Sequence, residues 1–238
     1  GMNGGQYQAV EFAGSAVQAL SMAERMTLSN MSAEMGAQAG LIAADETTLS
    51  HLRGIGVAPE HLAGAEQWFT DTDADYEQQD FDASTLSPQV AAPHSPANTR
   101  DVAEFADVSP SIAYIGACTG AKLEDLRAAA SVLKGQRVAA GVQLMVAPAS
   151  AREQAQATQE GVMQTLLDAG ATVLPNSCGA CAGYGATFPE GSTVISTTAR
   201  NFKGRMGPAS VNVYLASPYT VAASALRGRI SDAREVLA

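Results

Sequence analysis

The three cysteines of this sequence are the residues whose type and spacing best suit metal chemistry. Cys178 and Cys181 form a C-x-x-C pair on a glycine-containing segment, a spacing that lets two thiolates reach one metal centre. Cys118 follows a predicted strand and adds a third thiolate. An odd number of cysteines does not fit a closed set of disulfides, so metal binding or catalysis is favoured.

The cysteine pattern alone leaves several kinds of site open. Three thiolates on an iron–sulfur cubane would leave one iron without a protein ligand, and an open iron acts as a Lewis acid on a hydroxyl or carboxylate. A lone C-x-x-C pair can instead be redox-active, and zinc would usually take a fourth ligand. Three buried, unreactive cysteines are a further alternative, because cysteine is often buried in protein cores.

Arg200 and Arg205 bracket a short loop and suit a substrate with several carboxylates, since a guanidinium is the preferred bidentate partner of a carboxylate. The net charge is −10, so an anion-binding protein of this composition has to concentrate its few cations locally. Lys122 is a third cation close to a candidate residue. A solvated basic loop is the alternative interpretation of the arginine pair.

Asn30 and Glu34 are four residues apart and share a face if their segment is helical. Glu34 has alanine, glycine and methionine neighbours, and burial among them would raise its pKa. It is therefore a candidate acid–base group, with a capping or surface glutamate as the alternative. The histidines are scattered, and we assign none of them as a ligand.

The predicted elements bring the cysteines and arginines to one place. We expect strands over 111–116, 142–147, 171–174, 193–197 and 211–215, and helices over 122–133, 152–169 and 220–226. Strands that alternate with helices indicate a mostly parallel α/β sheet. Ligands bind such sheets at the carboxyl ends of the strands, and each candidate follows a strand end. We therefore expect all three cysteines and both arginines at one rim.

The first part of the chain has weaker signals. We expect a strand over 8–12 and a helix over 15–20 that resumes after a break at 26–30. Asp45 is placed to cap a further helix.

Composition shifts between the two halves of the chain. Residues 70–100 are first acidic and then proline-rich, which is typical of a linker or surface crossing. We therefore expect an α/β subdomain over 1–90, a linker over 91–101 and a second α/β subdomain over 102–238.

Composition also argues against some functions. A nucleic-acid partner is not expected at a net charge of −10, because nucleic-acid affinity comes mainly from clustered lysine and arginine. No apolar run has the roughly 18 residues that span a bilayer, and no signal-peptide pattern is visible. We therefore expect a cytoplasmic protein that has neither a nucleic acid nor a membrane as partner.

Nearly the whole sequence resembles the large subunits of the aconitase and 3-isopropylmalate dehydratase family, which includes homoaconitase. The segments that carry this resemblance are EFAGSAVQALSMAERMTLSNMSAEMGAQAGLIAADETT, SPQVAAPHSP, YIGACTGAKLEDLRAAASVLKG, SCGACAGYG, TTARNFKGRMG and VYLASPYTVAASALRGRISD. In order and spacing they are similar to the second domain, the linker and the third domain of that family. The combination is specific, although no single segment is.

The resemblance implies an aconitase-like three-layer α/β/α fold with mostly parallel sheets and two subdomains. It also implies a hydro-lyase or isomerase that dehydrates and rehydrates a small hydroxy di- or tricarboxylate, as 3-isopropylmalate dehydratase does in leucine biosynthesis. The implied cofactor is a [4Fe–4S] cluster, whose three ligands match Cys118, Cys178 and Cys181.

The resemblance also gives roles to the remaining candidates. Arg200 and Arg205 match the R-N-F-x-G-R motif and are expected to bind substrate carboxylates. Asn30 matches a residue near the cluster, and Glu34 matches a residue of the active site in the N-M-x-x-E motif.

Three positions depart from the family pattern, which usually has serine, asparagine and asparagine where this chain has Ala117, Gly120 and Ala199. Polar groups near the cluster are therefore missing. The family's N-terminal acid–base domain and its small swivelling subunit are not recognisable here, so we expect an enzyme component that is inactive alone. A non-catalytic aconitase-like scaffold or interaction module is the alternative.

Overall fold

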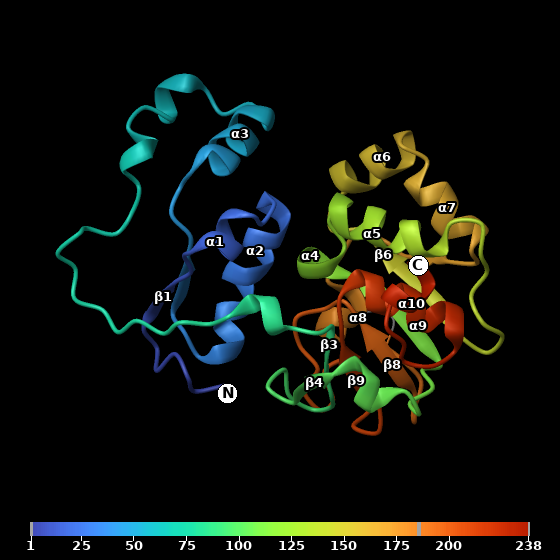
Figure 1. Cartoon of the computed structure of the whole chain (residues 1–238). Coiled ribbons are helices and arrows are strands. Elements are labelled where there is room, and N and C mark those ends of the chain that lie inside the picture. Colours follow the sequence, from blue (N-terminus) through green and yellow to red (C-terminus); the bar gives the residue numbers. More distant parts are fainter. Residues whose placement is uncertain (1, 185–186, 238) are drawn as a thin grey trace. The chain divides into compact units, whose positions relative to one another are not determined.

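The computed structural model describes residues 2–184 and 187–237, and the chain divides into two compact units, Gly1–Leu86 and Ser87–Ala238. The residues expected to form a linker, 91–101, belong to the second unit. They include β4 (Thr99–Asp101), which pairs antiparallel with β3 (Gln89–Ala91) (Figure 1). In the described part of the chain, no helix is long and apolar enough to span a bilayer.

A mostly parallel seven-stranded sheet forms the centre of the second unit, which confirms the expected α/β fold. Its strand order is β4-β3-β9-β8-β5-β6-β7. The five parallel strands are β5 (Ile112–Gly116), β6 (Gln143–Ala147), β7 (Thr172–Val173), β8 (Thr193–Ser196) and β9 (Asn212–Leu215).

Alternation along the strands divides the apolar core between the two faces of the sheet. On β5, Ala113 and Ile115 belong to one apolar core, and Ile112 and Tyr114 belong to the other. The first face is covered by α5 (Leu123–Leu133) and α9 (Pro218–Arg227), which also pack against each other. The C-terminal helix is α10 (Arg234–Leu237).

The prediction of a single helix over 152–169 is wrong in one respect, because the structure has two helices there. They are α6 (Ala151–Gln159) and α7 (Val162–Asp168). Gly161 separates them with a φ of 76°, a left-handed conformation that glycine adopts without the steric cost of a side chain. The chain thus turns inside a segment whose apolar pattern continues.

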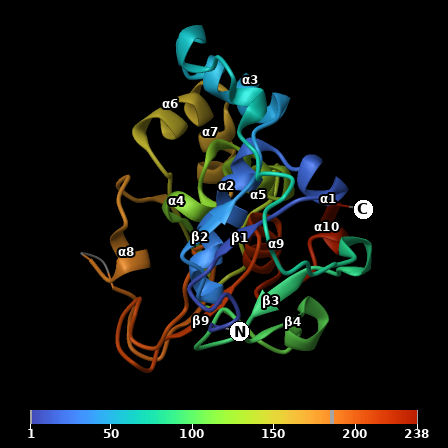
Figure 2. The same cartoon turned by 90° about the vertical axis from the view of Figure 1, so that its left-hand side faces the viewer.

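The order of the strands decides which face each connection covers. From β5 the chain extends through β6 to β7 on one side, and β8 and β9 then lie on the other side of β5. Right-handed crossovers in opposite directions cover opposite faces of a sheet. The connections β7–β8 and β8–β9 accordingly contribute Phe188 and Met206 to the second core, away from α9 (Figure 2).

The first unit contains a two-stranded parallel sheet and several short helices. Its elements are β1 (Ala9–Glu11), α1 (Ser15–Gln18), α2 (Met22–Met31), the 3-10 helix η1 (Ser32–Met35), β2 (Ala39–Leu41) and α3 (Glu46–Gly54). Further 3-10 turns over both units are Pro59–His61, Ala65–Gln67, Ala83–Thr85 and Val102–Phe105.

The break expected at 26–30 is wrong, because α2 is continuous there. The helices part before Ser21, whose side chain and that of Glu24 form a capping box at the start of α2. The expected cap at Asp45 is confirmed, since its carboxylate accepts a hydrogen bond from the N–H of Thr48 at 3.2 Å.

A half-buried ion pair joins α2 to α3. Arg25 has a side chain only 3% exposed, and it binds both carboxylate oxygens of Asp45, at 2.6 and 2.7 Å. It also donates to the carbonyl groups of Leu20 and Gln18, so the buried guanidinium is well paired. The pair therefore holds two helices together across a segment with few buried apolar side chains.

We predict that Asp45→Asn lowers the free energy of unfolding by about 2 kcal/mol at pH 7, less than for a fully buried pair, because the Asp45 side chain is 40% exposed. Asparagine keeps the helix cap, so the loss reports the charge. The hydrogen bond from Arg25 lowers the pKa of Asp45, so this stabilisation is present above the unfolded pKa and is lost as the pH falls through the folded one.

Urea unfolding at pH 7 and pH 3 measures the difference in free energy of unfolding between the wild type and Asp45→Asn. We expect this difference to become smaller below about pH 4. The control is Asp82→Asn, since Asp82 is an exposed cap of residues 83–85. Equal effects of the two variants at pH 7 would contradict the prediction.

Candidate functional site

The candidate site of the second unit lies where the strand order reverses. β5 is flanked by β6 and β8, and the chain leaves this sheet first on one side and then on the other. Ligands of parallel sheets bind at the carboxyl ends of the strands at such a switch point. Cys118 follows β5 and Arg200 follows β8, so the structure places both just past neighbouring strand ends.

Cys118 lies in a one-turn helix, α4 (Ala117–Gly120), that begins in a strained conformation. Ala117 has a φ of 67°, a left-handed conformation that costs a residue with a side chain roughly 1–2 kcal/mol. Gly120 packs so tightly that an added Cβ would lie 2.2 Å from the carbonyl oxygen of Thr197. The departure from the family pattern at position 120 thus has a steric counterpart in this chain.

Thr197 also ties the two strand ends together. Its Oγ1 accepts a hydrogen bond from the N–H of Gly116 at 3.0 Å, and its own N–H donates to the carbonyl of Tyr114 at 3.1 Å. The turn that presents Cys118 is therefore fixed to the end of β8, and the Cys118 thiol is exposed.

The C-x-x-C pair lies at a second one-turn helix, α8 (Gly179–Ala182), in the connection from β7 to β8. Cys178 immediately precedes this helix and is exposed, whereas Cys181 lies inside it and is half-buried. The N–H of Tyr184 donates to the carbonyl of Gly179 at 2.9 Å and closes the turn.

Two neighbouring connections on the same face of the sheet bring Arg205 to the cysteine pair. A Cβ on Gly183 would lie 2.8 Å from the carbonyl oxygen of Arg205, and the N–H of Phe188 donates to the carbonyl of Met206 at 3.0 Å. Arg205 also donates a hydrogen bond to the side chain of Cys181.

Both other cysteines contribute to the electrostatic environment of Cys181. Burial raises the pKa of the Cys181 thiol, Arg205 opposes this rise, and Cys118 and Cys178 add to it. The pKa of Tyr114 is raised to about 12, first by burial and then by Cys181 and Cys178. Among residues 2–184 and 187–237, no three His, Cys, Asp or Glu side chains are placed to bind one metal ion.

Lys122 has structural contacts in the second unit. The Lys122 ammonium donates to the carbonyl of Thr119 at 2.5 Å and lies 3.1 Å from Asp125, so it stabilises the turn after Cys118. Burial raises the pKa of Asp125, and Lys122 opposes that rise.

Asn201 is fully buried, and no role was predicted for it. In the sequence it lies between Arg200 and Arg205. Its amide donates to the carbonyl of Ala92, the residue after β3, at 2.8 Å and to the carbonyl of Val213 in β9 at 3.0 Å, and so connects the end of β3 to β9. No local pattern indicates this role, because its partners come from distant strands.

Asn30 and Glu34 lie in the first unit and in different environments. Asn30 is exposed on α2, whereas Glu34 is 7% exposed and lies in η1. The change of helix type after Met31 separates the two side chains, which a continuous α-helix would have placed on one face.

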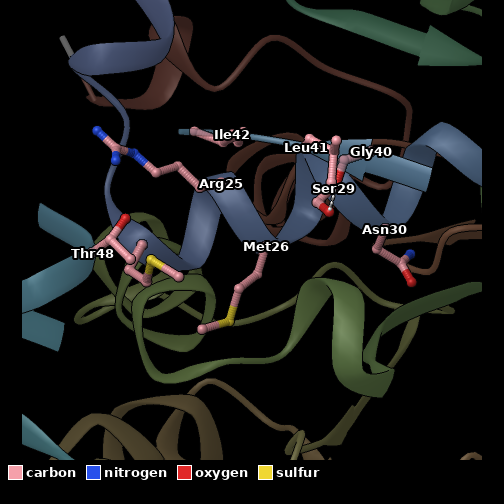
Figure 3. Close-up of a pocket in the computed structure, with 9 residues that line it drawn as sticks. Arg25, Met26, Ser29, Asn30, Gly40, Leu41, Ile42 and Thr48 are labelled. Carbon is pink, nitrogen blue, oxygen red and sulfur yellow. Dashed lines mark hydrogen bonds between the residues drawn. The ribbon is translucent and has the colours of Figure 1, made fainter. Parts of the chain in front are cut away.

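Asn30 lies at one end of a groove of about 450 Å³ beside α2, and Arg25 lies at the other end (Figure 3). The groove is lined by Met22, Arg25, Met26, Ser29, Asn30, Gly40, Leu41, Ile42 and Thr48. The Ser29 hydroxyl donates to the carbonyl of Gly40 at 2.6 Å and holds β2 against α2.

The second unit thus combines a parallel sheet, a reversal of strand order and thiols beside an arginine. Together these features define a protein with a candidate metal-binding or anion-binding site at the carboxyl ends of its strands. The aconitase family (aconitate hydratase) matches residues 1–228 of the sequence. The chain therefore belongs to the aconitase family.

Curated relatives are similar over essentially the whole chain. The chain is 41% identical to 3-isopropylmalate dehydratase large subunit 1 of Pyrococcus furiosus and 42% identical to the corresponding large subunit of Moorella thermoacetica, with 100% of the chain and 56% of each relative covered. It is 44% identical to the probable methanogen homoaconitase large subunit of Methanosarcina mazei, with 99% and 59% covered. The chain spans little more than half the length of these relatives.

We predict that Gly120→Ala lowers the free energy of unfolding by about 1–3 kcal/mol, because its Cβ would overlap the carbonyl of Thr197. The matched control is Gly54→Ala at the end of α3, where a Cβ meets no atom within 4 Å and alanine favours the helix by up to about 1 kcal/mol. Thermal or urea unfolding of both variants measures the effects. A Gly120→Ala variant as stable as the wild type would contradict the tight contact.

Proposed function

We propose that this chain is a component of an iron–sulfur hydro-lyase or isomerase that dehydrates and rehydrates a small hydroxy di- or tricarboxylate. The observation that supports this most directly is the convergence of Cys118, Cys178 and Cys181 beside Arg205 in an aconitase-family chain. The names of its relatives, 3-isopropylmalate dehydratase and homoaconitase large subunits, favour the same class of reaction.

The proposed cofactor is a [4Fe–4S] cluster with the three cysteines as ligands, and the chemistry of these donors fits it. Two thiols are exposed and the third is half-buried, so all three can be reached. The thiolates of a cubane bind different irons, so they require a wider spacing than the ligands of a single ion. When bound, such a cluster supplies a Lewis-acidic iron for the hydroxyl and a carboxylate of the substrate.

A buried donor beside the cysteines also fits an anionic group. The Nε of Arg205 is buried and, within the described residues, has no hydrogen-bond partner. A buried donor of this kind usually has an acceptor in the working state of a protein. We propose that Arg205 faces the cluster and its substrate.

The chain's own residues would then bind and orient the substrate. Arg200 and Arg205 would anchor its carboxylates, since a guanidinium binds a carboxylate through two parallel hydrogen bonds. Asn30 is proposed as a further substrate contact and Glu34, which is buried, as an acid–base group that holds or accepts a proton.

We also propose two further components. The relatives are named as large subunits, so a small-subunit partner is expected. The second component is a segment that supplies acid–base residues, as the resemblance to the family implies.

We predict that the chain takes up about four irons and four sulfides on anaerobic reconstitution, and that Cys118→Ala reduces this uptake severely because a ligand is lost. Iron and sulfide analysis with an absorption spectrum is the measurement. Ser177→Ala is the matched control, since Ser177 is exposed beside the pair but is not a proposed ligand. Failure of the wild type to incorporate iron would favour the non-catalytic scaffold. Binding of zinc in place of iron would favour a structural zinc site.

We predict that Arg200→Lys weakens citrate and 3-isopropylmalate binding to the reconstituted chain by about 10-fold or more, because lysine cannot form the bidentate pair. Isothermal titration measures the affinity, with Arg229→Lys as a control for an exposed arginine elsewhere. Equal affinities of the two variants would contradict a role for Arg200 in carboxylate binding.

A further inference from the structure

Tyr114 is a fully buried tyrosine on the face of the sheet that the cysteine-bearing connection covers. Its ring packs edge-on against Phe188, with the ring centroids 5.6 Å apart and the planes at 71°. Cys181 packs against the same apolar core. Tyr114 therefore lies between the central strand and the segment that carries the C-x-x-C pair.

The hydroxyl of Tyr114 points toward the carboxyl end of β5. Side chains two residues apart on a strand lie on the same face, so Tyr114 and position 116 are neighbours. A Cβ on Gly116 would lie 2.3 Å from the Cζ of Tyr114 and 2.5 Å from its hydroxyl oxygen. The phenol thus occupies the place of a side chain at 116, and its hydroxyl reaches the strand end that Cys118 follows.

This hydroxyl is an unused donor. It is buried, and the described part of the chain offers it no hydrogen-bond partner. Cys181 and Cys178 both interact with it electrostatically, so the two thiols lie near it. Native proteins rarely leave such a group without an acceptor. Arg205, which is hydrogen-bonded to Cys181, is itself a donor and cannot supply one.

We propose that the Tyr114 hydroxyl donates a hydrogen bond to a sulfur of the [4Fe–4S] cluster on the side of Cys181. This assignment rests on the proposed cluster and makes Tyr114 a positioning residue, not a catalytic one. Hydrogen bonds to cluster sulfurs offset their negative charge, so they stabilise the reduced form and retain the iron. Gly116 is the residue that makes room for this arrangement.

The test is Tyr114→Phe, which removes only the hydroxyl and keeps the ring packing against Phe188. After anaerobic reconstitution, we expect the variant to release iron to a chelator about 10-fold faster than the wild type, and to have a lower reduction potential. Before reconstitution we expect the variant to unfold at the same urea concentration as the wild type or at a higher one, because a buried donor without a partner is removed.

Tyr214→Phe is the matched control. Tyr214 lies on β9 and packs edge-on against Phe105 in the other apolar core. Removal of its hydroxyl therefore does not affect the surroundings of the cysteines. We expect wild-type iron release from this variant.

The outcomes separate this inference from the proposed function. A wild type that binds the cluster, with a Tyr114→Phe variant equal to it in iron release and potential, would overturn the inference alone. A Tyr114→Phe variant less stable than the wild type before reconstitution would also overturn it, since the hydroxyl would then have a protein partner. A wild type without any cluster would overturn both.

Discussion

The contact between the ends of β5 and β8 is the constraint on which the candidate site depends. Thr197 binds the backbone of β5 through its N–H and its hydroxyl, and Gly120 packs against its carbonyl without room for a side chain. This fixes the turn that begins at the strained residue Ala117. Cys118 is thereby presented beside the strand end that leads to Arg200.

The reversal of strand order explains why the other residues arrive at the same rim. Because β8 and β9 lie on the opposite side of β5 from β6 and β7, the later connections cover the second face of the sheet. One of these carries Cys178 and Cys181, and the other carries Arg205. Their mutual contact, through Gly183 and the hydrogen bond from Phe188 to Met206, brings the arginine to the thiols.

Much of this arrangement could be predicted from the sequence. Apolar runs were enough to predict five strands, and Asp45 was identifiable as a cap because aspartate before a helix has a local signature. The break at Gly161 was missed because the apolar pattern runs through it. The short pair β3 and β4 was missed because the strands have three residues each and flank a proline-rich turn.

The roles that sequence reasoning did not find belong to residues with distant partners. Asn201 resembles part of a substrate-binding loop, yet its amide connects the end of β3 to β9. Tyr114 looks like one more apolar residue of a buried strand, and only the position of its hydroxyl above Gly116 sets it apart. Contacts of this kind depend on strand order and side-chain direction, which a local pattern does not contain.

Mössbauer spectroscopy of the chain reconstituted with iron-57 can show whether the three cysteines leave one iron of a cluster without a protein ligand. We predict a cubane in which one iron differs from the other three, and in which added citrate changes the spectrum of that iron alone. A spectrum of equivalent irons that citrate leaves unchanged would contradict this prediction.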